Sequence, residues 1–176
     1  NGNSGTVTIG ASGTQTAVGT CSSGNTAHAW HNGTSGKYNS SLNFDGTDDY
    51  VSTGDIFDSS SIMSWGGWFK ANAFGSTGIL TKRIGATEYI QYGLSAYAGD
   101  LYCLQSSDGG DWQTLISTPV PSTGSWHHAV CTNDGTTAKM YLDGKQVGTP
   151  DSTPATGLAA SSETFKIGYG RVASAD

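Results

Sequence analysis

Two histidines stand side by side in the segment Ser125–Gly135, whose sequence is SWHHAVCTNDG. Histidine commonly serves as a general base or a metal ligand, so His127 and His128 are the first candidates for chemistry. The segment is typical of a β-strand, in which neighbouring side chains point to opposite faces. The two rings therefore cannot share a metal ion or act as a catalytic pair. We expect a half-buried histidine that is hydrogen-bonded within the fold, beside a core Trp126.

The same alternation divides the side chains of this strand between two faces. One face carries Trp126, His128 and Val130, and the other carries His127, Ala129 and Cys131. Two further tryptophans, Trp65 and Trp68, lie within the strand-like segment WGGWF. Together with Trp126 they are predicted to fill the core.

Catalysis by paired carboxylates is the next chemistry to consider, since glycoside hydrolysis needs two acidic groups about 5–10 Å apart. The chain has only two glutamates, Glu88 and Glu163, and each stands alone. The aspartates fall in turns, often next to glycine, where aspartate is first of all a turn former. No Ser-His-Asp pattern, G-x-S-x-G or phosphate-binding loop occurs in the sequence. We therefore predict that this chain is not an enzyme.

Three cysteines are present, Cys21, Cys103 and Cys131, and none forms a C-x-x-C pair. The spacing therefore predicts neither a zinc site nor a thioredoxin-like redox site. Cys103 and Cys131 both lie in strand-like segments, so a disulfide between them is one interpretation. The other is that both are buried free thiols, which behave as small apolar side chains.

The composition is that of strands joined by turns. Of 176 residues, 26 are glycine and only 12% are charged, while serine and threonine are abundant. The net charge is −6, and the eight lysines and arginines are scattered along the chain. A nucleic-acid surface needs clustered basic residues, so we predict no nucleic-acid partner. No apolar run approaches the roughly 20 residues of a membrane span, and we expect no direct membrane contact.

Short strand-like segments separated by turn signals every 8–12 residues fill the chain from Ser41 onwards. This spacing predicts an all-β fold, an antiparallel β-sandwich with no confident helix. Asp143-Gly144 suits a tight hairpin, which makes residues 126–149 a three-stranded meander. Residues 1–40 are a Gly/Ser/Thr-rich N-terminal segment with one short strand near Val7, and we assign them to the same domain as the sandwich of residues 41–176.

Four segments together carry a resemblance to a known family. They are SLNFDGTDDYVS (Ser41–Ser52), SWGGWFKAN (Ser64–Asn72), WHHAV followed by NDG and KMYLDGK, and TFKIGYG. In order and spacing they resemble the laminin-G-like, concanavalin A-like lectin/glucanase superfamily, in particular the jelly-roll modules of surface proteins. The resemblance implies a concanavalin A-like jelly roll. It is unspecific for function, because the fold hosts lectins, lyases, glucanases and adhesive spacers.

The two ends depart from the family pattern. Segments similar to the family's first and last strands are missing, and a sandwich without them would expose sheet edges. We therefore expect either that the chain is an interior piece of a longer polypeptide or that a partner subunit supplies a strand.

The resemblance implies a non-catalytic module for carbohydrate binding or adhesion. The location that it implies is extracellular, or on the surface of a cell or virion. The alternative is a structural domain of an extracellular filament (pilin-like) or of a virion surface protein. The partners are then a glycan in the first case and neighbouring subunits of the same assembly in the second.

Sugar binding uses exposed aromatic rings beside polar groups that orient hydroxyls. Candidates that lie near predicted turns are Tyr97, Tyr102 and Trp112, with Asp108 as the polar group. The alternative is that Tyr102 and Trp112 fill the core.

Calcium is the one cofactor to consider, because many members of the resembled family bind it with loop aspartates. Ca²⁺ requires six to eight oxygen ligands. The segment FDGTDD offers Asp45, Asp48 and Asp49 as candidate ligands. The alternative is that these aspartates only cap turns.

Overall fold

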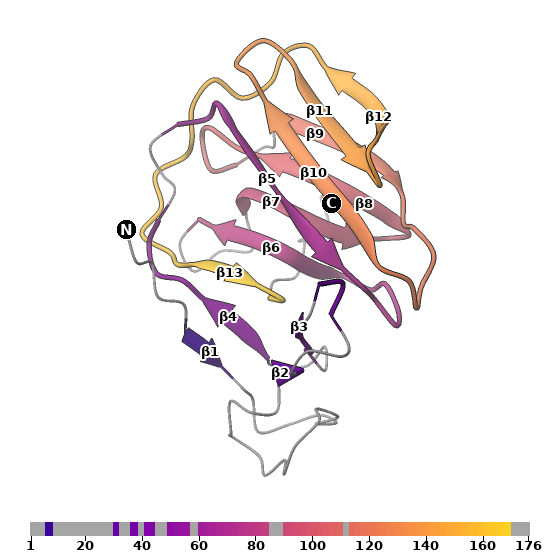
Figure 1. Cartoon of the computed structure of the whole chain (residues 1–176). Coiled ribbons are helices and arrows are strands. Elements are labelled where there is room, and N and C mark those ends of the chain that lie inside the picture. Colours follow the sequence, from indigo (N-terminus) through magenta and orange to yellow (C-terminus); the bar gives the residue numbers. More distant parts are fainter. Residues whose placement is uncertain are drawn as a thin grey trace.

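A computed structural model of the chain describes residues 6–8, 30–31, 36–38, 41–44, 49–56, 60–84, 90–110 and 113–169. These residues form thirteen strands and no helix. Accordingly, the described residues contain no helix that is long and apolar enough to cross a membrane. Two antiparallel sheets face each other as layers, and β5 and β10 cross in front of β7 and β8 in Figure 1. The predicted all-β sandwich is therefore confirmed.

The larger sheet has seven strands in the order β1-β4-β13-β6-β7-β8-β9. The order shows that β13, late in the chain, inserts between two early strands, while β6 to β9 form a meander. The bounds are β1 Thr6–Thr8, β4 Tyr50–Ser52, β13 Phe165–Ile167, β6 Thr77–Arg83, β7 Ile90–Tyr97, β8 Asp100–Gln105 and β9 Thr114–Pro119.

The smaller sheet has four strands in the order β12-β11-β10-β5. The bounds are β5 Met63–Phe69, β10 His127–Asn133, β11 Ala138–Leu142 and β12 Lys145–Asp151. Here β10 to β12 form the predicted meander. Asp143 and Gly144 both have positive φ, 51° and 80°, as a tight hairpin turn requires. A separate two-stranded pair, β2 (Trp30–His31) and β3 (Ser41–Leu42), adds a strand where we had expected a loop around His31.

The core lies between the two sheets. The inward residues of β7 and β8 meet those of β5, β10 and β11, with Trp65 packed edge-on against Tyr92. Cys103 of β8 is joined to Cys131 of β10 by a disulfide, which ties one sheet to the other. Closing a loop of 28 residues in this way stabilises a fold by roughly 3–4 kcal/mol, mainly by restricting the unfolded chain.

The long connection from β12 to β13 closes one end of the sandwich through buried polar groups. The Asn133 side-chain amide donates hydrogen bonds to Gln105 Oε1 (2.7 Å) and to the Ala155 carbonyl (2.9 Å). Gln105 Nε2 donates in turn to the carbonyl of Ser61 (3.0 Å). Ala155 also donates its backbone N–H to Thr114 Oγ1 (2.9 Å). Since each donor is matched, these buried polar groups fix the connection without an uncompensated desolvation cost.

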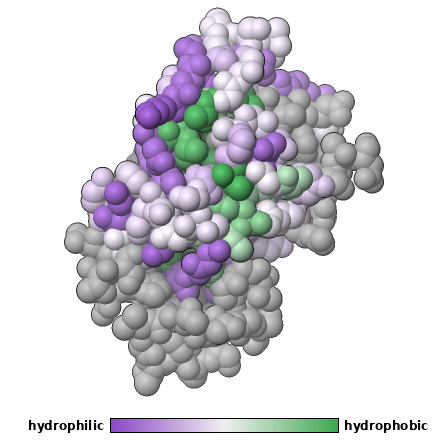
Figure 2. Space-filling view, turned by 90° about the vertical axis from the view of Figure 1, so that its right-hand side faces the viewer, coloured by the Kyte–Doolittle hydropathy of each residue, from purple (hydrophilic) through white to green (hydrophobic). Residues whose placement is uncertain are grey.

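The two sheets also meet at one edge, where β12 lies against β9. Gly148 makes this approach possible, because a Cβ built there would lie 2.6 Å from the Ser117 carbonyl oxygen. Figure 2 shows the side of the molecule where β12 lies, with apolar atoms gathered in its middle between more hydrophilic margins. Leu142 of β11 and Val147 of β12 are partly exposed members of the core.

The glycine pair Gly66-Gly67 of β5 explains the segment WGGW. A Cβ on Gly66 would collide with the backbone of β10, at the Ala129 carbonyl oxygen and, at 2.8 Å, at Val130 Cα. A Cβ on Gly67 would meet only the end of the Leu80 side chain, at 4.0 Å. The close pairing of β5 and β10 therefore depends on Gly66 and not on Gly67.

We predict that Gly66→Ala lowers the free energy of unfolding by about 2 kcal/mol or more, because backbone must shift to admit the methyl group. Gly67→Ala is the matched control, and we expect a change within about 0.5–1 kcal/mol of zero. Urea denaturation of the three proteins measures both values. Equal destabilisation by the two substitutions would contradict the assigned role of Gly66.

Candidate functional site

The outer face of the four-stranded sheet carries a group of aromatic side chains. Burial alternates along β10, where Ala129 and Cys131 face the core, so His128 and Val130 face outward as predicted. In the same way Trp65 of β5 is buried, while Trp68, three residues later, points to the opposite face. The register places Trp68 directly opposite His128.

Trp68 is the centre of this group. Its ring is stacked against that of His128, with centroids 4.9 Å apart and an interplanar angle of 29°. Tyr38, from the N-terminal segment, meets Trp68 edge-on at 5.8 Å. Lys37 Nζ lies 4.6 Å from the Trp68 ring centroid, within the range of a cation–π contact. Trp68 is 39% exposed and Tyr38 is 70% exposed, so both rings are open to a ligand.

A second tryptophan extends this surface. Trp126 immediately precedes β10 on the side of His128, and Lys70 Nζ lies 5.9 Å from its ring centroid. We call Tyr38, Trp68, Trp126 and His128 the aromatic platform. The prediction that Trp68 and Trp126 fill the core is wrong, since neither belongs to the buried core; Trp65 does.

Polar groups continue the face beyond the platform. Val130 lies between Gly66 and Tyr141, and Thr132 lies between Ser64 and Lys139. Exposed aromatic rings beside hydroxyl and ammonium groups are the arrangement that binds sugars, since rings cover the apolar face of a pyranose and polar groups orient its hydroxyls.

His127 lies on the other face of β10 and is held in a hydrogen-bonded chain. Its Nδ1 lies 2.7 Å from Asp143 Oδ2, and its Nε2 lies 3.2 Å from Ser122 Oγ. The other carboxylate oxygen of Asp143 accepts the backbone N–H of His128 at 2.9 Å. The hydrogen bond from His127, followed by that from the His128 N–H, lowers the pKa of the Asp143 carboxyl.

The order Ser122, His127, Asp143 is that of a nucleophilic triad, and no motif in the sequence predicted it. His127 Nε2 also lies 3.1 Å from the carbonyl oxygen of Ser122. Nε2 thus lies within hydrogen-bond reach of both the hydroxyl and the carbonyl oxygen of one loop residue, which holds His127 to that loop. We therefore assign this Ser122–His127–Asp143 hydrogen-bonded chain a structural role. Asp143, in the β11–β12 turn, ties that turn to the start of β10, and His127 ties β10 to the loop before it.

The residues predicted to bind sugar are only partly brought together. Tyr97 and Tyr102 belong to a small cluster with Ile90 and Leu104, away from the main core. Burial is the first cause that raises the pKa of the Tyr102 hydroxyl, and the neighbouring Asp100 adds to it. Trp112 lies outside the described residues.

Asp108 lies beyond the opposite end of β8 from Tyr97, so the two cannot bind one sugar unit. Its carboxylate accepts the N–H of Gly110 at 2.9 Å and contacts Ser106 Oγ at 3.3 Å. The hydrogen bond from Gly110 is the largest cause that lowers the pKa of Asp108. Asp108 thus caps its own turn.

Of the candidate calcium ligands, Asp45 and Asp48 lie outside the described residues, and Asp49 is buried. Within the described ranges, no three histidine, cysteine or acidic side chains are grouped closely enough to hold a metal ion. Calcium binding stays a prediction.

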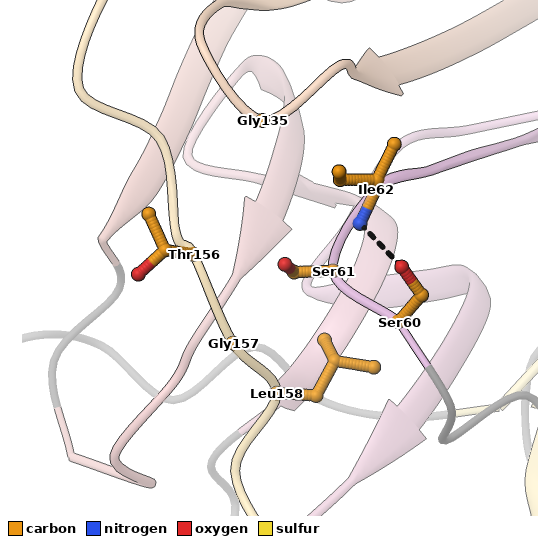
Figure 3. A pocket seen from close by; sticks show the side chains of 7 residues that line it. All are labelled: Ser60, Ser61, Ile62, Gly135, Thr156, Gly157 and Leu158. Carbon is orange, nitrogen blue, oxygen red and sulfur yellow. Dashed lines mark hydrogen bonds between the residues drawn. The ribbon is translucent and has the colours of Figure 1, made fainter.

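A hollow of about 360 Å³ lies at the end of the sandwich near the β12–β13 connection (Figure 3). It is lined by Ser60, Ser61, Ile62, Gly135, Thr156, Gly157 and Leu158. The Ser60 hydroxyl accepts the N–H of Ile62, as the dashed line in Figure 3 marks. The lining contains no aromatic ring and no charged side chain, so the hollow offers neither a stacking surface nor an acid or base.

Comparisons with known proteins agree with this architecture. The family model of the concanavalin A-like lectin/glucanases superfamily matches residues 45–176. A similar solved structure is domain 4 of AbnA, an extracellular GH43 arabinanase from Geobacillus stearothermophilus, in complex with arabinotriose. The identity is 17%, the match covers 95% of this chain and 74% of that chain, and the TM-score is 0.57.

The carbohydrate-binding module CBM66 from Bacillus subtilis is similar at 14% identity, over 81% of this chain and 84% of that chain, with a TM-score of 0.41. A search of the curated proteins gave no match to this chain.

We predict that Asp143→Asn lowers the free energy of unfolding at neutral pH by about 0.5–1 kcal/mol, a modest value because the carboxylate is half exposed. Asparagine tolerates the positive φ of this position, so backbone strain does not enter. Because the pKa of Asp143 is lowered on folding, its contribution is present above the ordinary pKa and is lost as pH falls through the folded value.

The difference between the two proteins should therefore shrink as urea denaturation is repeated toward about pH 2. The other aspartates titrate alike in the wild type and in Asp143→Asn, so their contributions cancel in the difference between the two free energies of unfolding. A difference that is constant with pH would show that the pairing with His127 is not its source.

Proposed function

The chain belongs to the concanavalin A-like lectin/glucanase superfamily, and we propose on this premise that it is a non-catalytic carbohydrate-binding module. The observation that carries the proposal is the aromatic platform on the outer face of the four-stranded sheet. The rings of Tyr38 and Trp68 are exposed although a sandwich of this size has a core available for them. Exposed tryptophan and tyrosine that gather on one face mark a binding surface.

Two rings of the platform stand on strands that are closely paired. Trp68 and His128 lie opposite each other on two paired strands, and Gly66 holds those strands together. On the inward side, the same strand β10 is anchored by the Cys103–Cys131 disulfide. A surface that is ordered before binding loses little conformational entropy when a ligand docks, which favours a sugar-binding role.

We also propose an extracellular or cell-surface location. A disulfide that spans the core fits an oxidising compartment, since cytosolic proteins keep their thiols reduced. The absence of catalysis is part of the proposal and is supported by the assignment of His127 to a structural hydrogen-bonded chain.

A structural subunit of a filament or of a virion surface is the second proposal. Its supporting observation is the exposure of Tyr38, Trp68 and Ile62, which a neighbouring subunit would cover. Light scattering separates the two roles. A monomer that binds glycan supports the module, and an assembly in which Trp68 fluorescence becomes protected from quenching supports the subunit.

The proposal predicts that Trp68→Ala weakens glycan binding about 10- to 100-fold, the loss expected when an aromatic contact of roughly 1.4–2.8 kcal/mol is removed. Binding is measured by screening soluble neutral and acidic polysaccharides, followed by calorimetry. Tyr97→Ala is the matched control, because Tyr97 belongs to the other sheet, and we expect its affinity to be unchanged. If Trp68→Ala keeps full affinity for glycan, or if Tyr97→Ala loses it, the binding site does not lie on the aromatic platform.

A further inference from the structure

Two lysines stand over the tryptophans of the platform, although the whole chain is acidic. The chain carries a net charge of −6 with eight lysines and arginines. Two of the eight, Lys37 and Lys70, lie over the rings of Trp68 and Trp126. A third, Lys139, lies on the same outer face, opposite Thr132.

Acidic side chains are absent from the strand positions around the platform. The outward positions of β5, β10 and β11, and the β12 position paired with Tyr141, carry no aspartate or glutamate; they are Ser64, Gly66, Trp68, His128, Val130, Thr132, Lys139, Tyr141 and Gln146. Asp143 lies at the end of β11, and both its carboxylate oxygens are engaged, one by the N–H of His128 and the other by His127. The positive charge of this face is therefore concentrated at Lys37 and Lys70 beside the two tryptophans, while Asp134 partners Lys139 at the far end of β10.

The position of Lys37 decides which ligand gains from this charge. Its ammonium stands over the Trp68 ring, where a stacking sugar ring would lie. A neutral sugar must displace the ammonium and offers it no replacement for the cation–π contact. A sugar with a carboxylate offers the displaced ammonium a charge-assisted hydrogen bond while its ring stacks on the indole.

We propose that the platform binds acidic polysaccharides, in which uronate carboxylates pair with Lys37 and Lys70 while the sugar rings stack on Trp68 and Trp126. This inference rests on the proposed carbohydrate-binding function and adds the chemical class of the ligand. The two lysine–tryptophan pairs define two neighbouring subsites, one ring and one cation each, that successive units of one chain occupy.

Polygalacturonate and its fully methyl-esterified form are the probes, because they share a backbone and differ in charge. Calorimetry with the full chain should show the acid form bound at least about tenfold more tightly than the ester, with the preference falling as salt is added. Lys37→Gln and Lys70→Gln should each weaken binding of the acid form about fivefold or more and leave any binding of the ester unweakened.

Lys166→Gln is the matched control. Lys166 Nζ also lies over aromatic rings, 5.1 Å from the Tyr50 centroid and 4.3 Å from that of Tyr169, but on β13 of the other sheet. Its substitution removes the same charge and should leave the affinity unchanged. Dextran sulfate tests whether negative charge alone is enough for tight binding. We expect it to bind more weakly than polygalacturonate.

Several outcomes would overturn the inference. The first is that the ester binds as tightly as the acid. The second is that Lys166→Gln and Lys37→Gln lose equal affinity for polygalacturonate. The third is that dextran sulfate binds more tightly than polygalacturonate. If the protein binds a neutral glycan such as arabinotriose through Trp68 and does not prefer the acid form, the ligand class is not acidic polysaccharide. The proposed carbohydrate-binding function would then still hold. Binding of no glycan at all overturns both.

Discussion

The close pairing of β5 with β10 is the constraint on which both faces of the smaller sheet depend. Gly66 lets the two strands approach, and the pairing then fixes which side chains stand opposite each other. On the inward face this places Trp65 and Cys131 in the core, with the disulfide to Cys103 behind them. On the outward face it places Trp68 against His128. The core and the binding surface are thus two sides of one strand pair.

The histidine pair shows how adjacent identical residues acquire different roles from strand geometry alone. His127 faces the sandwich and links Asp143 to the loop that contains Ser122. His128 faces outward and lines the platform, and its backbone N–H is bound by the same Asp143 carboxylate. One turn aspartate therefore orders the strand that carries both rings.

Most of the strands, the 126–149 meander and the family could be predicted from the sequence, because turn residues mark the strand ends and the motifs keep their spacing. The position of Trp68 could also have been derived. Trp65 and Trp68 are three residues apart, so one strand cannot direct both into the core. The contact of Lys37 and Tyr38 with Trp68 could not be predicted, because the two residues come from a Gly/Ser-rich segment about 30 residues earlier in the sequence. Their signal was only that they are the single lysine and the single tyrosine of residues 1–40. The contact of Ser122 with His127 depends on loop closure and has no local pattern.

The most direct test of the platform is to follow the indole N–H resonances of the protein by NMR while it is titrated with the glycan that binds most tightly. The account predicts that the resonances of Trp68 and Trp126 move and that the resonance of buried Trp65 stays in place. Shifts confined to Trp112, or to the backbone amides around Tyr97 and Tyr102, would contradict it and assign ligand binding to another part of the fold.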